Sequence, residues 1–504
     1  MIPVPLSDLV AVTGGRPAGG ADGLAARGAA VTGPVVVDSR LVEPGSLFVA
    51  LAGERTDGHD HAAAAVAAGA VAVLAGRELD VPCVVVADQL AALAALARHV
   101  VDALRTPGRG HTGLEGLTVV GVTGSSGKTS TKDLLAVLLA DAGPTVAPQG
   151  SFNNEIGLPL TALRCDAGTR FLVAEMGARR PGNIAYLTEV TPPDVAVVLN
   201  VGAAHAGVFG SREATAATKA ELPAALGAQG LAVLNADDPL VAAMAAGTRG
   251  RVVLTGLSPS AQVRADDVRL DAWSRPSFTL RTPAGDAAVT LALHGEHHVA
   301  NALAAAAVAL EAGLTPARIA ELLVTATPAS RWRMEVTTRP DGVTVVNDAY
   351  NANPDSVRAA LKALAGMGRP QPDSSGSPRP PKRRTWAVLG EMLELGDSAR
   401  DEHDAIGRLA VRLDVSRLVA VGEGARMVHA GANHEGSWGE ESAWVPDAAA
   451  ALELLRAELA PGDVVLVKAS RSVGLDAVAT ALLADVPPRA PASTPVGTAA
   501  GGAA

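Results

Sequence analysis

The chain has 504 residues, a hydrophobic content of 48% and a formal net charge of −10. This length predicts about three domains, and the acidic balance argues against nucleic-acid binding, which needs a basic surface. No apolar run approaches the roughly 20 residues of a membrane span, and the N-terminus lacks the features of a signal peptide. The two cysteines, Cys83 and Cys165, form no disulfide framework and no metal-site spacing. We therefore expect a cytoplasmic protein without membrane insertion.

Residues 1–108 are expected to form a first α/β unit. Its strands are short apolar runs at 35–38, 46–50, 71–75 and 83–87. Helical patterns cover 61–69 and 88–105, the second with an aspartate at its start. The Gly- and Pro-containing residues 106–113 then read as a linker.

Residues 114–327 are expected to form a central unit in which strands alternate with helices. The expected strands are 117–122, 171–176, 194–200, 230–235 and 251–255. Such alternation predicts a mostly parallel sheet, whereas 262–293 looks like antiparallel hairpins. Ligands of parallel sheets bind at the carboxyl ends of the strands, where Glu175, Asn200 and Asn235 fall.

Residues 328–486 are expected to form a third, Rossmann-like α/β unit, so the fold class is α/β throughout. Its strands are predicted near 343–347, 385–389, 417–421 and 463–468. The Pro/Ser-rich residues 369–384 are typical of a mobile loop insertion. The Pro/Ala/Gly-rich tail, 487–504, is expected to be disordered.

A glycine-rich stretch follows the first central strand and opens into a helical segment, 132–142. Strand, glycine-rich turn and helix together form the context of a phosphate-binding loop, in which backbone N–H groups and the helix N-terminus face one anion. Val122 stands where the generic pattern has its first glycine. Lys128 would reach the outer phosphates of ATP, and the Thr129 hydroxyl would help to hold Mg²⁺. The residues expected to bind ATP here are Gly124, Ser125, Ser126, Gly127, Lys128, Thr129 and Ser130.

Four further features could contribute to the chemistry. Glu175, at a strand end, could face the metal. His205 in a loop and Lys219 on a helical segment are, taken singly, more often structural or solvated than functional. The composition of the segment Asn347 to Asp355 is typical of a turn that leads into a helix with a proline at its start. It also gathers many hydrogen-bonding groups at a strand end.

These residues resemble the Mur ligases of peptidoglycan synthesis over roughly residues 30–485, in a three-domain arrangement with a central phosphate-binding loop. The most discriminating string is Tyr350-Asn-Ala-Asn-Pro354. The shared landmarks are Asp38 to Arg40, Gly53 to His59, Thr123 to Thr129, Ser151 to Gly157, Glu175 to Gly177, His205, Lys219 to Glu221, His294 to Asn301, Ser330 to Arg333, Asn347 to Pro354, Leu389 to Met392 with His403, and Lys468 to Arg471.

The resemblance implies a role for each matching position. The uridine nucleotide would be held by Ser39, Arg40, Thr56 and Asp57. Metal ions would be held by Thr129, Glu175, His205 and a carbamylated Lys219. The catalytic residues would be Lys128, Glu175, His205 and Lys219. Nucleotide contacts would also come from Asn301, Arg331 and Asp348. The remaining substrate contacts would be Asn153, Asn154, Tyr350, Asn351 and Asn353.

The implied reaction joins D-alanyl-D-alanine to a UDP-N-acetylmuramoyl tripeptide, with ATP, Mg²⁺ and an acyl-phosphate intermediate, in a monomeric enzyme. Whether the third peptide residue is diaminopimelate or lysine stays open. One stretch departs from the family, which commonly has a histidine or asparagine where this chain has Arg179-Arg180-Pro181.

Other functions are conceivable on the same residues. A tripeptide-forming relative would carry a different string around Tyr350. A folate polyglutamylating ligase would share the ATP unit but would lack the uridine-binding unit and that string. A catalytically silent nucleotide-binding partner would have lost metal positions, whereas Lys128, Thr129, Glu175, His205 and Lys219 are all present.

Overall fold

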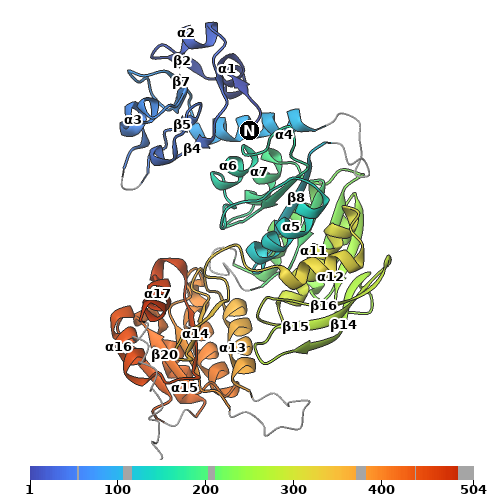
Figure 1. The fold of residues 1–504 in the computed structure, drawn as a ribbon, viewed down its shortest axis with the longest axis vertical. Helices are drawn as coiled ribbons and strands as arrows, with labels where there is room; N and C mark the ends of the chain where they lie inside the picture. The colour runs from blue at the N-terminus through green and yellow to red at the C-terminus, as the bar shows by residue number, and fades with distance from the viewer. Residues whose placement is uncertain (54–55, 106–115, 203–209, 370–381, 437–438, 486–504) are drawn as a thin grey trace, which may run out of the picture.

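The computed structural model describes residues 1–53, 56–105, 116–202, 210–369, 382–436 and 439–485. They form three α/β units, each built around its own sheet, that follow one another from the top to the bottom of Figure 1. His205, the linker at 106–113, most of the 369–384 insertion and the tail at 487–504 lie outside the described residues.

The first unit contains a five-stranded sheet in the order β2-β7-β6-β5-β4. Its strands are β2 (Arg16–Ala18), β4 (Val35–Val36), β5 (Leu47–Val49), β6 (Ala72–Ala75) and β7 (Cys83–Val85). The four strands from β4 to β7 are parallel and were expected, whereas β2 was not. Also unexpected are β1 (Val4–Pro5), α1 (Leu6–Thr13), α2 (Ala21–Ala26) and β3 (Ala30–Val31).

Helix α4 (Gln89–Leu104) attaches the first unit to the central one, whereas α3 (Ala62–Ala67) covers the first sheet alone. Asp88 caps α4 as expected, because its side chain accepts hydrogen bonds from the N–H groups of Leu90 and Ala91. The buried side chains of α4 belong to one apolar cluster that includes Leu158 and Leu187 of the central unit. The first two units therefore share a core although each has its own sheet.

The central sheet has nine strands in the order β16-β15-β14-β13-β12-β11-β8-β10-β9. They are β8 (Thr118–Thr123), β9 (Thr145–Val146), β10 (Phe171–Glu175), β11 (Val195–Val198), β12 (Leu231–Asn235), β13 (Arg251–Gly256), β14 (Val263–Leu270), β15 (Pro276–Thr282) and β16 (Gly285–Thr290). Neighbouring strands from β9 to β14 are parallel. The expected hairpins, β14 to β16, are antiparallel and extend the same sheet.

Helices cover both faces of the central sheet (Figure 1). On one face lie α5 (Lys128–Ala142), α11 (His298–Glu311) and α12 (Pro316–Thr325). On the other lie α6 (Gly157–Ala162), α7 (Asn183–Val190), α9 (Arg212–Ala224) and α10 (Pro239–Ala242). Successive strand residues alternate between these layers, and for this reason the buried parallel strands read as continuous apolar runs.

The C-terminal unit contains a six-stranded sheet in the order β17-β18-β22-β19-β20-β21. The strands are β17 (Glu335–Thr338), β18 (Thr344–Asn347), β19 (Thr385–Leu389), β20 (Arg417–Val421), β21 (Ser442–Val445) and β22 (Val464–Lys468). Only β17 is antiparallel to its neighbour. The helices α13 (Pro354–Gly368), α14 (Ala399–Arg412) and α15 (Arg426–His434) cover one face, and α16 (Ala448–Glu458) and α17 (Asp476–Ala484) cover the other.

A buried polar network joins the central and C-terminal units directly behind the phosphate loop. The Asp133 carboxylate accepts hydrogen bonds from the N–H (3.0 Å) and the hydroxyl (3.1 Å) of Ser330. The Lys132 ammonium donates to the Ser330 hydroxyl at 3.0 Å and pairs with Asp133. Because all three side chains are buried and mutually bonded, the chain entering the C-terminal unit is tied to helix α5.

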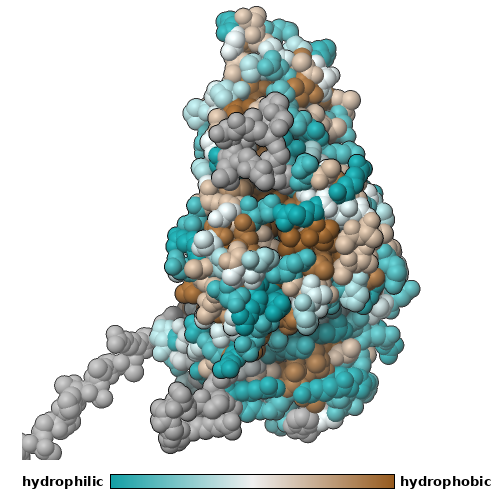
Figure 2. Space-filling view, turned by 90° about the vertical axis from the view of Figure 1, so that its right-hand side faces the viewer, coloured by the Kyte–Doolittle hydropathy of each residue, from teal (hydrophilic) through white to brown (hydrophobic). Residues whose placement is uncertain are grey.

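Hydrophobic residues on the face drawn in Figure 2 lie in small areas separated by hydrophilic ones. Within the described ranges, none of the helices combines the length and the apolar character needed to cross a membrane.

Candidate active site between the central and C-terminal domains

The glycine-rich stretch forms a tight loop between β8 and α5. β8 lies between β10 and β11, so the loop leaves the sheet at the point where the strand order reverses, which is the usual ligand position in such sheets. Gly127 has a φ of +83°, and a Cβ there would lie 2.5 Å from the Asn301 carboxamide oxygen. Helix α5 starts after Gly127 without a side-chain cap, so its first N–H groups are available to an anion.

Asn200 holds this loop in shape from the end of β11. Its side-chain oxygen accepts a hydrogen bond from the Ser126 N–H at 2.9 Å, and its amide nitrogen donates to the Ser126 carbonyl at 3.1 Å. Its own carbonyl accepts from the Ser125 N–H at 3.1 Å. Asn200 attracted attention because it follows a strand end. At that position it stabilises the conformation of the phosphate loop.

The Lys128 ammonium lies inside the curve of the loop and donates to the Gly124 carbonyl at 2.6 Å. Burial lowers the pKa of Lys128, against the opposing effect of Glu175. A buried ammonium needs an anionic or hydrogen-bonding partner. A phosphate group cradled by the loop would supply that partner.

Glu175, at the end of β10, is completely buried beside Thr129. Its Oε1 accepts hydrogen bonds from the Asn153 amide at 2.8 Å and from the Thr129 hydroxyl at 3.3 Å. Its Oε2 is buried and has no partner among the described residues. An orphaned carboxylate oxygen beside a hydroxyl is the donor chemistry that suits Mg²⁺, so the residues present fit that ion.

Lys219 lies on α9 and is buried, not solvent-facing. Burial, and then the nearby Lys128 ammonium, lower its pKa to about 7. Glu221, a possible surface partner, instead accepts hydrogen bonds from the N–H groups of Gly182 and Ala185. The described residues provide no hydrogen-bonded partner for Lys219, a setting that favours the neutral amine.

Arg333 extends from the C-terminal domain to the phosphate loop. Its Nη2 lies 3.2 Å from the Thr129 hydroxyl and 3.3 Å from the Ser151 hydroxyl. Its guanidinium carbon lies 4.2 Å from the centre of the Tyr350 ring, a favourable cation–π geometry. By contrast, Arg331, the residue expected here, is exposed and does not line the cavity.

Asp348 supports the turn that carries Arg333. Its carboxylate accepts a hydrogen bond from the Met334 N–H at 3.1 Å and pairs with the Lys468 ammonium at 2.6 Å. Both flanking residues of Arg333 have positive φ, +60° at Trp332 and +51° at Met334. Conformations of this kind cost energy in non-glycine residues and concentrate at functional sites.

The segment after β18 brings its polar residues to the same place. Asn353 caps α13 by accepting the Ser356 N–H at 2.9 Å, and its amide lies 3.4 Å from the Ser125 carbonyl of the phosphate loop. The Asn351 carbonyl accepts from Lys468 at 2.9 Å. Many of the polar groups in this segment form the turn and the cap of α13, as the composition of the segment indicated.

Two histidines with mutually tilted rings at the start of α11 adjoin Asn301. The rings of His297 and His298 are 4.2 Å apart, and the Nε2 of His298 is buried without a partner among the described residues. Burial lowers the pKa of His297 to about 4, and burial also lowers the pKa of His298 well below its usual value. Neutral rings at this position can hydrogen-bond a base. The sequence predicted no role for either of these histidines, which lie within the motif from His294 to Asn301.

Apart from Lys219 and Gly124, which do not line it, these groups line one cavity of about 1310 Å³ between the central and C-terminal domains, which also reaches the start of α4. It brings together most of the expected site residues: Ser125, Ser126, Gly127, Lys128, Thr129, Ser130, Asn153, Asn154, Glu175, Asn301, Asp348, Tyr350, Asn351 and Asn353. It adds Arg333, His297, His298 and Lys468, which sequence reasoning had given no role.

The residues expected to bind uridine, Ser39, Arg40, Thr56 and Asp57, lie in the first unit and do not line this cavity. Asp38 is bonded to Arg40, whose guanidinium and N–H group lower the pKa of that carboxyl to about 2. Asp57 accepts hydrogen bonds from His59. Their assignment to the uridine nucleotide stays a prediction.

Comparison with family models matches three consecutive segments of the chain. Residues 32–102 match "Mur ligase family, catalytic domain", residues 122–309 match "Mur ligase middle domain", and residues 332–471 match "Mur ligase, glutamate ligase domain". The matched segments coincide with the three sheet-containing units described above.

Individual proteins are similar over nearly the whole length. The UDP-N-acetylmuramoyl-tripeptide--D-alanyl-D-alanine ligase of Mycobacterium leprae is 53% identical over 491 residues, covering 90% of this chain and 93% of that protein. A crystal structure of MurF from Acinetobacter baumannii superposes with a TM-score of 0.79 at 29% identity, covering 96% and 99%. The MurF ligase from Thermotoga maritima in complex with ADP gives 0.74 at 29% identity, covering 90% and 97%.

Proposed function

This chain belongs to the Mur ligase family, and we propose that it joins D-alanyl-D-alanine to a UDP-N-acetylmuramoyl tripeptide at the expense of ATP. The observation that carries the proposal is the meeting of Thr129, Glu175 and Arg333 above the phosphate loop. Two of them come from the central domain and one from the C-terminal domain. Such a site is complete only when the two domains are together.

ATP is the phosphoryl donor, and the loop residues 124–130 hold its phosphates. The N–H groups at the start of α5 face the anion. Lys128, bonded to the Gly124 carbonyl, and Arg333, bonded to Thr129, supply positive charge. Thr129, Glu175 and a carbamylated Lys219 would hold Mg²⁺, which when bound neutralises phosphate charge. Phosphoryl transfer depends mainly on such positioning and charge neutralisation.

The reaction has two steps with balanced products. A carboxylate oxygen of the tripeptide attacks the γ-phosphorus of ATP, ADP leaves, and an acyl phosphate forms. The amine of D-alanyl-D-alanine then attacks the acyl carbon, and phosphate and a proton are released. The polar residues Asn153 and Asn154, at the central wall of the cavity, support an assignment to the peptidyl end of the first substrate.

Closing the site with the C-terminal domain protects the intermediate. An acyl phosphate is hydrolysed by water, and domain closure around such intermediates is a common way to exclude it. The buried tie between Ser330 and Asp133 supports this assignment, because it fixes the point from which the C-terminal domain approaches.

The remaining assignments concern partners and compartment. The central and C-terminal domains of this one chain supply both walls of the proposed site, and we propose that it acts as a monomer. The net charge of −10 supports a function without nucleic acid. Cys83 and Cys165 are buried free thiols, which suits a reducing compartment and supports a cytoplasmic location.

A panel of substrates tests the proposal. Phosphate release from ATP should require the UDP-muramoyl tripeptide and D-alanyl-D-alanine together. Turnover with a UDP-muramoyl dipeptide and one diamino acid would instead indicate a tripeptide-forming ligase. Turnover with folate and glutamate would indicate a polyglutamylating one.

A further inference from the structure

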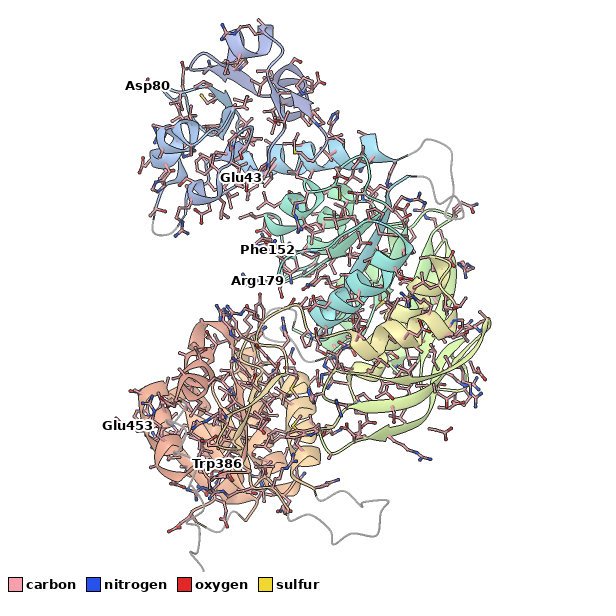
Figure 3. The ribbon with its side chains drawn as sticks, viewed as in Figure 1. Glu43, Asp80, Phe152, Arg179, Trp386 and Glu453 are labelled. Atoms are coloured by element: carbon pink, nitrogen blue, oxygen red, sulfur yellow. The ribbon has the colours of Figure 1, made fainter. Side chains whose placement is uncertain are left out.

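Arg179 and Glu394 lie opposite each other in the lining of the cavity. The Arg179 Nε lies 3.8 Å from the Glu394 Oε1. Arg179 follows β10, four residues after Glu175, whereas Glu394 belongs to the C-terminal domain, in the loop after β19. Both line the cavity of the proposed site. Figure 3 shows Arg179 at the edge of the central domain, on the side toward the C-terminal domain.

The fold does not explain this arginine. Its side chain is 81% exposed, and within the described residues it donates no hydrogen bond. At 3.8 Å the contact with Glu394 is a loose ion pair, and exposed pairs of this kind contribute only about 0–1 kcal/mol. A carboxylate ligand could therefore take the place of Glu394 beside Arg179 at little cost in stability.

The backbone on both sides is nevertheless held firmly. The N–H groups of Arg179 and Arg180 both donate to the Asn183 side-chain oxygen at 3.1 Å. On the other side, the Leu393 N–H donates to the Ser470 hydroxyl at 2.9 Å. Glu394 itself has a φ of +64°, an uncommon conformation for a residue other than glycine. The two charges are thus carried on hydrogen-bonded backbone segments that line the cavity of the proposed site.

We propose that Arg179 and Glu394 together recognise a zwitterionic amino-acid group at the far end of the tripeptide's third residue. The inference rests on the proposed function. An arginine binds a carboxylate through two parallel hydrogen bonds, and a glutamate accepts from an ammonium. A diamino dicarboxylic acid such as diaminopimelate carries both groups on its far carbon, whereas a lysine side chain ends in an ammonium alone.

The incoming dipeptide is the other source of an ammonium and a carboxylate. Its amine, however, must be unprotonated and directed at the acyl carbon during the reaction, so it cannot stay paired with Glu394. Arg179 also lies on the central wall, with Asn153 and Glu175. The geometry therefore favours the tripeptide as the ligand of Arg179 and Glu394. Arg179, which departs from the family pattern, then determines which third peptide residue the enzyme prefers.

The test compares two UDP-muramoyl tripeptides, one ending in diaminopimelate and one in lysine, at saturating ATP and D-alanyl-D-alanine. The wild-type enzyme should prefer the diaminopimelate peptide in kcat/KM. Arg179→Gln and Glu394→Gln should each raise the KM for that peptide about tenfold, the effect of losing one charge-assisted contact. The KM for the lysine peptide should stay within about twofold in Arg179→Gln, which removes no contact with it.

The matched control is Arg16→Gln with Glu78→Gln, an exposed ion pair of the first unit, which should change neither KM. An unchanged preference in Arg179→Gln would overturn the inference. So would a rise in the KM for D-alanyl-D-alanine with both peptides, which would assign Arg179 to the dipeptide. Absence of wild-type turnover with either tripeptide would instead contradict the proposed function itself.

Discussion

The Nη2 of Arg333 lies 3.2 Å from the Thr129 hydroxyl, although the two residues belong to different domains. Thr129 is in the first turn of α5, where the phosphates of ATP are expected, and Arg333 is held there by Tyr350 and by the turn bonded to Asp348. The guanidinium therefore supplies positive charge to the phosphate site only when the C-terminal domain is docked.

Arg333→Ala should reduce kcat by at least about 10²-fold, the loss typical of removing one group that stabilises developing charge. Arg331→Ala should have a much smaller effect, because its side chain is exposed outside the cavity. Steady-state phosphate release by the two variants makes the comparison. A larger loss in Arg331→Ala would support the assignment made from family resemblance and contradict the geometry.

Lys219 should work as a carbamate. Its lowered pKa of about 7 means that the neutral amine, the form that reacts with CO₂, predominates above pH 7 and is lost as the pH falls below it. Carbamate formation should therefore increase as the pH rises through 7. A carbamate signal in the ¹³C NMR spectrum after addition of labelled bicarbonate should follow that course and be absent in Lys219→Ala.

The same lysine allows a chemical rescue. Lys219→Ala should lose most activity, and acetate or formate should restore part of it by filling the vacated space with a carboxylate. Lys219→Arg keeps a positive charge and should stay inactive. Full activity of either variant without added carboxylate would rule out the carbamate role.

Ser330→Ala should weaken the tie between the two domains. The substitution removes one hydroxyl that bonds both Asp133 and Lys132. Hydrogen bonds to charged groups contribute about 1.5–3 kcal/mol, so the free energy of unfolding should fall by about that amount in urea titration. Ser416→Ala, which removes a hydroxyl within the C-terminal sheet region, provides a comparison that leaves the junction intact. Because the tie also positions the C-terminal domain, kcat should fall in Ser330→Ala but not in Ser416→Ala. An equal fall in kcat for both variants would contradict a positioning role for Ser330.

The long strands and the phosphate loop could be predicted because their signals are local. β8 and β10 are buried on both faces and read as apolar runs. A glycine-rich turn could arise by chance in a chain with 53 glycines, but here strand, glycines, Lys-Thr and helix follow in order. β1 and β3, with two residues each, carry no periodic signal. Their existence depends on their pairing with each other, which is a tertiary property.

Within the site, the sequence likewise could not show which of Arg331 and Arg333 reaches the phosphate loop. Both lie in one short motif, and the sequence does not reveal that Trp332 and Met334 adopt positive φ. Those two conformations, held through Asp348, decide which arginine reaches Thr129. His297 and His298 were likewise recognised as a motif but not as a buried, neutral pair, because burial depends on contacts distant in sequence.

The measurement that tests the central claim most directly is the product of a complete reaction. Incubation with ATP, UDP-N-acetylmuramoyl tripeptide and D-alanyl-D-alanine should yield the UDP-muramoyl pentapeptide by mass spectrometry, in equal amounts with released phosphate. Lys128→Ala should form neither product while keeping the wild-type melting temperature. Phosphate release without pentapeptide, or undiminished pentapeptide formation by Lys128→Ala, would contradict the account.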